Sequence, residues 1–182
     1  MLDVCLLGTG GMMPLPRRRL TSLMLRLGGH SLLIDCGEGT QVSLKMLNLH
    51  WKRIKYIFIS HMHADHVTGL PGLLMLSSQV DRDEPLYIYG PEKLRDYIDA
   101  NRRLLDMYIN YEIRFVPTQP GIILENEDYT VEAVPLLHTK PCMGFIPTGR
   151  RKAYYKNPEE DAILMDLDLT DPETLRRLGI EE

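Results

Sequence analysis

Several features are missing from this 182-residue sequence, and each absence excludes a class of protein. No apolar run approaches the roughly 20 residues that a membrane-spanning helix needs, so we expect no membrane partner. Residues 1–6 lack the basic region that begins a secretory signal peptide. The three cysteines, Cys5, Cys36 and Cys142, are too few and too scattered for a disulfide framework or a metal finger. We therefore expect a cytoplasmic protein.

The composition that is present is typical of a globular protein, with 44% hydrophobic and 25% charged residues. The length suits one domain with a substantial core. The net charge of −4 is unevenly distributed, because residues 157–182 hold nine acidic residues and two arginines. The other 156 residues carry a balance of +3, so the charge leaves nucleic-acid binding open without arguing for it.

The densest group of metal-binding side chains follows an apolar run at residues 56–59. The run is short and β-rich, so we expect a buried strand whose carboxyl end carries a functional site. His61 and His63 lie two residues apart and point the same way in an extended segment. Asp65 and His66 follow one turn later and can reach a second point nearby. Three histidines and an aspartate within six residues favour zinc or a similar divalent ion over a solvated polar loop.

Three other places offer candidate site residues, each with an ordinary structural alternative. His138 follows the apolar residues 129–137 directly, and a zinc ion held by His61 and His63 needs a third protein ligand. Asp35 lies at the end of a predicted strand, where an aspartate serves as a turn residue or as a hydrogen-bond partner of a ligand histidine. Arg17, Arg18 and Arg19 form either a solvated loop or a group that contacts phosphates.

Hydrophobic periodicity predicts an α/β fold in which strands and helices alternate along much of the chain. The expected strands are residues 2–7, 21–27, 31–34, 56–59, 85–89, 112–116, 121–124 and 129–137. The expected helices are residues 40–49, 70–80 and 92–107. The last helix is the clearest by period, and the helix at 70–80 has a proline in its first turn.

Several sequence strings together resemble the ribonuclease Z family of the metallo-β-lactamase superfamily. The H-x-H-x-D-H motif at 61–66 is shared with the whole superfamily, and Asp-Cys-Gly-Glu-Gly-Thr-Gln at 35–41 is more specific to ribonuclease Z. Further matching strings are Gly-Thr-Gly at 8–10, Gly-Leu-Pro-Gly at 69–72, Tyr-Gly-Pro at 89–91 and Pro-Cys-Met-Gly-Phe at 141–145. The resemblance covers about residues 1–146.

The resemblance implies a four-layer αββα sandwich made of two similar halves, with two zinc ions near the sheet edges. It implies hydrolysis of precursor tRNA, removing the 3′ trailer and leaving a 3′-hydroxyl, and a homodimer. His61, His63 and His138 resemble the ligands of the first zinc. Asp65 and His66 resemble ligands of the second, and Asp65 is also the usual candidate for the general base. Two such cations stabilise both the attacking and the leaving oxygens.

The sequence departs from the family in its last part. The second half of the sandwich, with its bridging aspartate and final histidine, is missing, and no histidine follows His138. Asp166 follows an apolar run but lacks the Gly-Asp-Thr setting of the bridging residue. We therefore predict a metallo-β-lactamase-like domain at 1–146, the N-terminal half of the sandwich, and an acidic arm or linker at 147–182, with a short helix beginning near Asp171. One zinc per chain then becomes an alternative to two.

Two other functions remain open from the sequence alone. The first is a related metallo-β-lactamase-fold hydrolase that acts on small esters or phosphodiesters. The second is a non-catalytic, truncated protein that keeps one metal ion. Half a sandwich also exposes apolar surface, which favours association.

Overall fold

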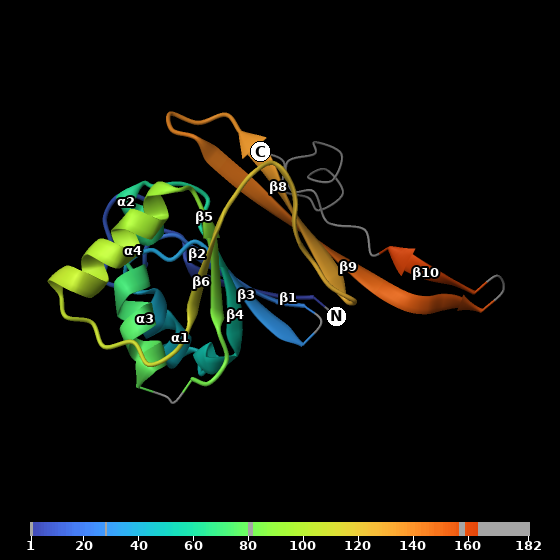
Figure 1. Cartoon of the computed structure of the whole chain (residues 1–182), viewed down its shortest axis with the longest axis horizontal. Helices are drawn as coiled ribbons and strands as arrows, with labels where there is room; N and C mark the ends of the chain where they lie inside the picture. Colours follow the sequence, from blue (N-terminus) through green and yellow to red (C-terminus); the bar gives the residue numbers. More distant parts are fainter. Residues whose placement is uncertain (1, 28, 80–81, 157–158, 164–182) are drawn as a thin grey trace.

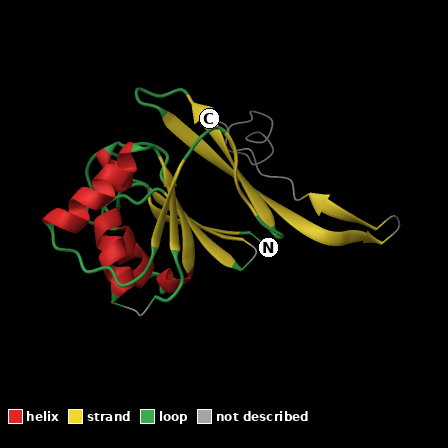
Figure 2. Ribbon diagram, viewed as in Figure 1, coloured by secondary structure: helices red, strands yellow, loops and turns green. Residues whose placement is uncertain are grey.

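The computed structural model describes residues 2–27, 29–79, 82–156 and 159–163, which form two sheets and a layer of helices (Figures 1 and 2). The strands of the first sheet are β1 (Asp3–Gly8), β2 (Ser22–Leu27), β3 (His30–Ile34), β4 (Ile54–Phe58), β5 (Leu86–Gly90) and β6 (Ile113–Pro117), arranged in chain order. Strands β1 to β3 pair antiparallel, and β3 to β6 pair parallel. The carboxyl ends of the parallel strands therefore share one edge, where α/β proteins place functional loops.

Helices cover one face of the first sheet (Figure 2). They are α1 (Thr40–Met46), α2 (Ala64–Val67), α3 (Leu70–Ser78) and α4 (Lys93–Leu104), with a short 3-10 helix, η1 (Trp51–Arg53), before β4. The strand residues Leu33, Ile57 and Ile88 are fully buried and share one core with leucines of α3 and α4. Within the described residues, no helix is long and apolar enough to cross a membrane.

A second sheet packs on the other face of the first (Figure 1). Its strands are β7 (Gly121–Glu125), β8 (Tyr129–Leu136), β9 (Cys142–Lys156) and β10 (Glu159–Ile163), in the order β10-β9-β8-β7. Aromatic rings join the two sheets, because Phe58 stacks on Tyr89 at 4.9 Å and lies 5.3 Å from Phe145. Tyr129 is fully buried, and its hydroxyl lies 3.1 Å from His30 Nδ1. The first sheet is therefore apolar on both faces, which explains the near-continuous apolar runs of β3 and β4.

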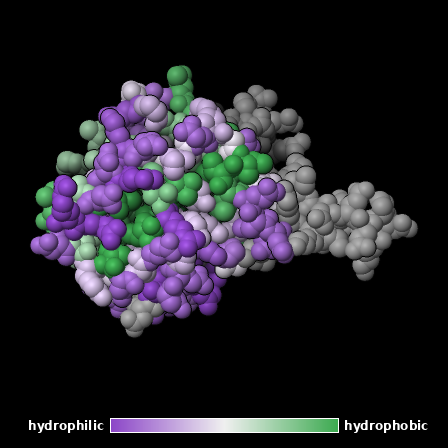
Figure 3. All heavy atoms as spheres, in the orientation of Figure 1, coloured by the Kyte–Doolittle hydropathy of each residue, from purple (hydrophilic) through white to green (hydrophobic). Residues whose placement is uncertain are grey.

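Part of the inner face of the first sheet extends beyond the second sheet. On the edge strand β1, Val4 is 60% exposed and Leu6 is 66% exposed. Their antiparallel partners are Leu25, which belongs to the core between the sheets, and Leu23, which packs against that core. Cross-strand partners point to the same face, so Val4 and Leu6 continue this apolar surface into solvent. Figure 3 likewise shows hydrophobic patches on a largely hydrophilic face.

The structure supplies three layers of the four-layer sandwich that the sequence predicts, namely helices, first sheet and second sheet. All strands and helices expected before residue 138 are present, with bounds that differ by a few residues. The sequence did not predict β9 and β10, which occupy part of the expected arm at 147–182. The domain division at residue 146 stays a prediction. Asp166, Asp168 and the helix expected near Asp171 lie outside the described residues.

Candidate metal centre

The histidine motif lies where β4 ends. Ser60, His61 and His63 follow this strand, and α2 carries Asp65 and His66. His138 comes from the second sheet, two residues after the end of β8. A cavity of about 300 Å³ opens between these segments. It is lined by His61, His63, Asp65, His66, Leu136, Leu137, His138 and Cys142.

Three ring nitrogens converge on one point. His61 Nε2 lies 2.9 Å from His63 Nδ1, and His138 Nε2 lies 3.2 Å from the same atom. One ligand atom of each histidine can be chosen so that all three lie within 4.8 Å of one another. Nitrogens bound to a tetrahedral zinc at about 2.05 Å lie roughly 3.3 Å apart. The arrangement of His61, His63 and His138 therefore fits a divalent metal ion, with the fourth position left for water or substrate.

The protein environment keeps His61 neutral. Its side chain is buried, and this burial is the main reason why the pKa of His61 is lowered to about 4. The neighbouring His66, His63 and His138 lower this pKa further, whereas the Asp35 carboxylate raises it. A neutral imidazole is the form that binds metal. The ring is also held from behind, because Ser60 Oγ lies 2.9 Å from His61 Nδ1 while Nε2 faces the cavity.

Asp35 organises the base of the site. Its carboxylate accepts hydrogen bonds from the Ser60 amide at 2.8 Å and from the Ser60 hydroxyl at 2.9 Å. His66 Nδ1 lies 2.6 Å from Asp35 Oδ2, so this ring donates to the carboxylate and turns Nε2 toward the cavity. Asp35 has a backbone φ of 57°, in the left-handed region that few non-glycine residues adopt. The surrounding hydrogen bonds hold this conformation, as is common at functional sites.

Asp65 and His66 form a second, smaller ligand pair. His66 Nε2 lies 3.7 Å from Asp65 Oδ2, which also accepts a hydrogen bond from the Met12 amide at 3.2 Å. Burial opposes charge on both groups, yet the Met12 hydrogen bond and the nearby histidines lower the pKa of Asp65 overall. Burial alone would lower the pKa of His66, but the hydrogen bond that its ring donates to Asp35 and the charge of that carboxylate raise it overall. Within the described residues, no further carboxylate or histidine lines this side of the cavity.

Close backbone packing explains two glycines, Gly37 in the 35–41 string and Gly69 after the histidine motif. A Cβ atom added to Gly37 would lie 2.3 Å from the carbonyl oxygen of Asp65. One added to Gly69 would lie 2.0 Å from the carbonyl oxygen of Gly37. The Cys36 amide donates to the His66 carbonyl, and the Gly69 amide donates to the Cys36 carbonyl. This loop and the motif helix α2 therefore sit closer together than side chains would allow.

Sequence reasoning missed three contributors to the site. Ser60 links Asp35 to His61 and lies within 3.5 Å of His66 Nδ1, and Met12 contributes only a backbone amide. Cys142 Sγ lies 3.7 Å from His61 Nδ1, and burial raises the pKa of this thiol, which makes it a poor metal ligand at neutral pH. The position of Ser60, between an apolar strand and the first ligand, was the only available signal. The other two contacts depend on distant segments.

The three arginines lie outside this cavity. Arg18 donates to the Thr9 carbonyl at 3.0 and 2.6 Å and to the Thr9 hydroxyl at 3.1 Å. Arg17, Arg18 and Arg19 all line a different cavity on the other side of their loop. The structure thus brings together His61, His63, Asp65, His66, His138 and Asp35, and it separates the arginines from them.

Comparison with known proteins gives consistent relatives. A family model described as "Anti-Pycsar protein Apyc1" matches residues 2–146. Ribonuclease Z of Treponema denticola is 61% identical over 159 residues, covering 87% of this chain and 52% of the relative. Ribonuclease Z of Borreliella burgdorferi is 41% identical over 164 residues, covering 87% of this chain and 51% of the relative.

A solved structure agrees with these relatives. The short form of human tRNase Z superposes with a TM-score of 0.74 at 31% identity, covering 91% of this chain and 68% of that one. The chain spans about half the length of the curated relatives it matches. The chain thus matches the Apyc1 family model and, by these relatives, belongs to the ribonuclease Z family of metallo-β-lactamase-fold proteins.

Proposed function

We propose that this chain supplies about half of a zinc-dependent endoribonuclease, which removes 3′ trailers from precursor tRNA by hydrolysis of a phosphodiester bond. The observation that carries the proposal is the convergence of His61, His63 and His138 on one point, in a chain 61% identical to a ribonuclease Z. When bound, zinc ions would neutralise developing negative charge on the attacking and leaving oxygens.

The residues of the site take distinct roles in this proposal. His61, His63 and His138 hold the first zinc, and Asp65 with His66 contributes to the second. Asp65 is ionised at neutral pH, because its pKa is lowered, and can accept the proton of the attacking water. Asp35 is a positioning residue that fixes His66 and, through Ser60, His61.

The remaining features of the proposal concern place and assembly. Arg17, Arg18 and Arg19 would contact phosphates of the RNA, and the protein would act in the cytoplasm.

We also propose a homodimer, supported by the exposed apolar side chains of Val4 and Leu6 on the edge strand β1 and of Leu2 just before it. Light scattering of the purified chain should give twice its 20.9 kDa mass. A monodisperse 20.9 kDa species would overturn the dimer without touching the proposed chemistry.

A second candidate function is hydrolysis of a small phosphodiester. This second function is favoured by the match of residues 2–146 to the family model described as "Anti-Pycsar protein Apyc1", which is not a ribonuclease Z model. The cavity at the metal centre is small, about 300 Å³, and would admit a small diester as well as an RNA strand. A non-catalytic, metal-binding chain is the third possibility.

Paired substrates separate these functions. The purified chain with added zinc is assayed on a 3′-extended tRNA and on bis(p-nitrophenyl) phosphate, beside His63→Ala and the matched control His50→Ala. We expect the chain to cleave the tRNA at its 3′ trailer. His63→Ala should abolish this cleavage, and His50→Ala should retain it, because His50 is exposed and lies outside the metal centre. Turnover of the small diester alone would support the second function. Bound zinc without either activity would support the third.

A further inference from the structure

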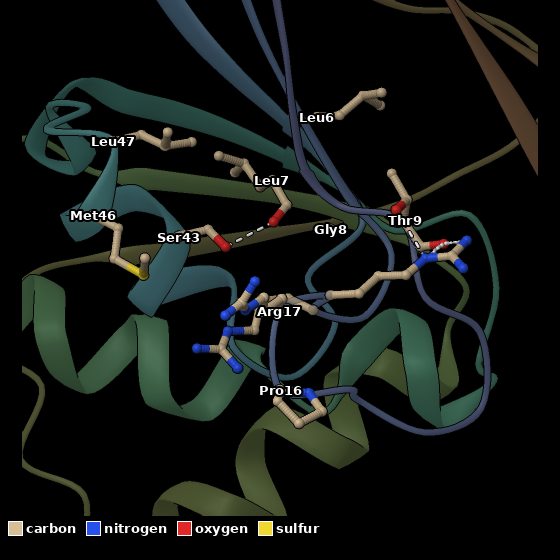
Figure 4. Close-up of a pocket in the computed structure, with 11 residues that line it drawn as sticks. Leu6, Leu7, Gly8, Thr9, Pro16, Arg17, Ser43, Met46 and Leu47 are labelled. Carbon is tan, nitrogen blue, oxygen red and sulfur yellow. Dashed lines mark hydrogen bonds between the residues drawn. The ribbon is translucent and has the colours of Figure 1, made fainter.

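A second cavity lies on the opposite side of the loop that touches the metal centre. It has a volume of about 510 Å³, and it is formed by the end of β1, residues 16–19 and helix α1 (Figure 4). The apolar side chains that line it are those of Leu7, Pro16, Met46 and Leu47, whereas Leu6 borders it with its side chain turned away (Figure 4). Small-molecule sites in proteins occupy roughly 300–1,000 Å³. The cavity is therefore large enough for a ligand with a sizeable apolar part.

All the charged side chains that line this cavity are positive. Its eleven lining residues include Arg17, Arg18 and Arg19 and no aspartate or glutamate, although the chain has a net charge of −4. Arg18 is fixed by its hydrogen bonds to Thr9. Within the described parts of the chain, the side chains of Arg17 and Arg19 make no hydrogen bond or ion pair with protein groups. Two guanidinium groups thus remain available to a ligand.

The cavity is built rather than being a chance gap between side chains. Ser43 of α1 donates a hydrogen bond to the Leu7 carbonyl at 2.7 Å, which ties α1 to β1 at the floor (Figure 4). The stem of Arg19 crosses Gly39, where a Cβ atom would lie 2.5 Å from Arg19 Cδ. The Gly10 amide donates to the Arg19 carbonyl at 2.8 Å. The position of Arg19 is thus fixed at both its backbone and its side-chain stem.

We propose that this cavity is a binding site for a nucleoside phosphate. Guanidinium groups bind phosphate oxygens through paired, charge-assisted hydrogen bonds. The exposed apolar side chains Met46 and Leu47 border the cavity and can contact the face of a base or the edge of a ribose. A bare anion would leave these apolar side chains unused, and an apolar ligand would leave Arg17 and Arg19 unpaired.

The loop that carries the arginines also reaches the metal centre. Its Met12 amide contacts Asp65, while Arg17 to Arg19 face the second cavity a few residues later. A strand of RNA held at the metal centre can therefore contact this cavity through another of its nucleotides, and a free mononucleotide offers the same chemistry. The proposal rests in part on the RNA contact proposed above for Arg17 to Arg19. Binding here needs neither metal nor catalysis, so its failure would leave the proposed metal chemistry untouched.

A competition binding assay tests this nucleotide site. A chelator in the buffer keeps metal out of the metal centre. A fluorescein-labelled hexamer of uridylate is bound to the full chain, and anisotropy reports its displacement by adenosine 5′-monophosphate or by inorganic phosphate. The variant Arg17→Ala/Arg19→Ala is compared with Arg102→Ala/Arg103→Ala, which removes the same charge from exposed positions on α4. Circular dichroism establishes that each variant is folded.

We expect the Arg17→Ala/Arg19→Ala variant to bind hexamer and mononucleotide at least roughly tenfold more weakly. Its log–log salt slope for the hexamer should fall by about 1.4, because each lost single-strand phosphate contact removes about 0.7. The α4 control should stay within about twofold. Leu47→Ala should weaken the mononucleotide roughly threefold and leave inorganic phosphate unchanged.

The relative affinities identify the source of the ligand. A hexamer that binds far more tightly than the mononucleotide supports an RNA strand, and equal affinities support a free nucleotide. Inorganic phosphate that competes as well as the mononucleotide would overturn the proposal in favour of a simple anion site. Equal losses in both double-arginine variants, or unchanged nucleotide binding in Arg17→Ala/Arg19→Ala, would also overturn it.

Discussion

The two ligand sets of the metal centre differ in how much of each the described chain supplies. His61, His63 and His138 come from two sheets and place three ring nitrogens around one point. Asp65 and His66 come from one short helix, and their nearest ligand atoms are 3.7 Å apart. The first set needs only water or substrate to complete a tetrahedron, whereas the second lacks a third protein ligand among the described residues. We therefore expect the first set to hold a metal ion tightly and the second to hold one weakly.

The largest effect is expected when one ligand is removed from the set formed by His61, His63 and His138. His63→Ala deletes the nitrogen that both other histidines approach. Bound zinc should fall from about one per chain to a small fraction of that after dialysis, because two ligands hold zinc weakly. Elemental analysis of the purified variant measures the change, with the exposed His50→Ala as the control. Unchanged zinc in the His63 variant would remove this residue from the ligand set.

A smaller effect is expected when the support of the second set is altered. In Asp35→Asn, the amide nitrogen can donate to His66 Nδ1, which reverses the present hydrogen bond. His66 would then carry its proton on Nε2 and could not bind metal through that atom. We expect metal affinity at this pair to fall about 10–100-fold and unfolding stability to fall by about 1–3 kcal/mol. The nitrogen chemical shifts of His66 report the tautomer directly, and an unprotonated Nε2 would contradict the prediction.

The smallest of these effects should come from Ser60, which touches both sets. Ser60→Ala removes the hydroxyl that contacts Asp35 and lies 2.9 Å from His61 Nδ1. We expect a loss of about 1 kcal/mol in unfolding stability and a loss of zinc affinity of less than about tenfold. Denaturant titration and zinc competition measure both, with Ser78→Ala on α3 as the matched control. A loss as large as that of His63→Ala would show that Ser60 has a more direct role.

The sequence predicted most of the first sheet because its strands carry their own signal. The apolar, β-rich run at residues 56–59 is followed by Ser60, His61 and His63, and the apolar run at 129–137 is followed directly by His138. Ligand spacing on one segment, as in His61 and His63, is a local property that sequence reveals. The meeting of His138 with that segment also follows, once a third ligand is required.

Contacts between distant segments could not be read from the sequence. The hydrogen bond from the Met12 amide to Asp65 depends on the path of the loop after β1. The position of Cys142 near His61 depends on the register of β8 with β9. Strand β9 was missed because residues 142–156 alternate poorly and contain glycine, proline and a basic run. Their strand conformation comes instead from pairing with β8 and β10.

The zinc content of the purified chain distinguishes one tight metal site from two. The purified chain is loaded with excess zinc, dialysed against a weak chelator and analysed for metal per chain, beside cleavage of a 3′-extended tRNA. We predict about one tightly held zinc per chain, a second that is weak or lost, and slow cleavage, because the leaving oxygen lacks its second cation. Two tightly held zinc ions with efficient cleavage would contradict this prediction. Asp166 and Asp168 would then be the first positions to test as missing ligands.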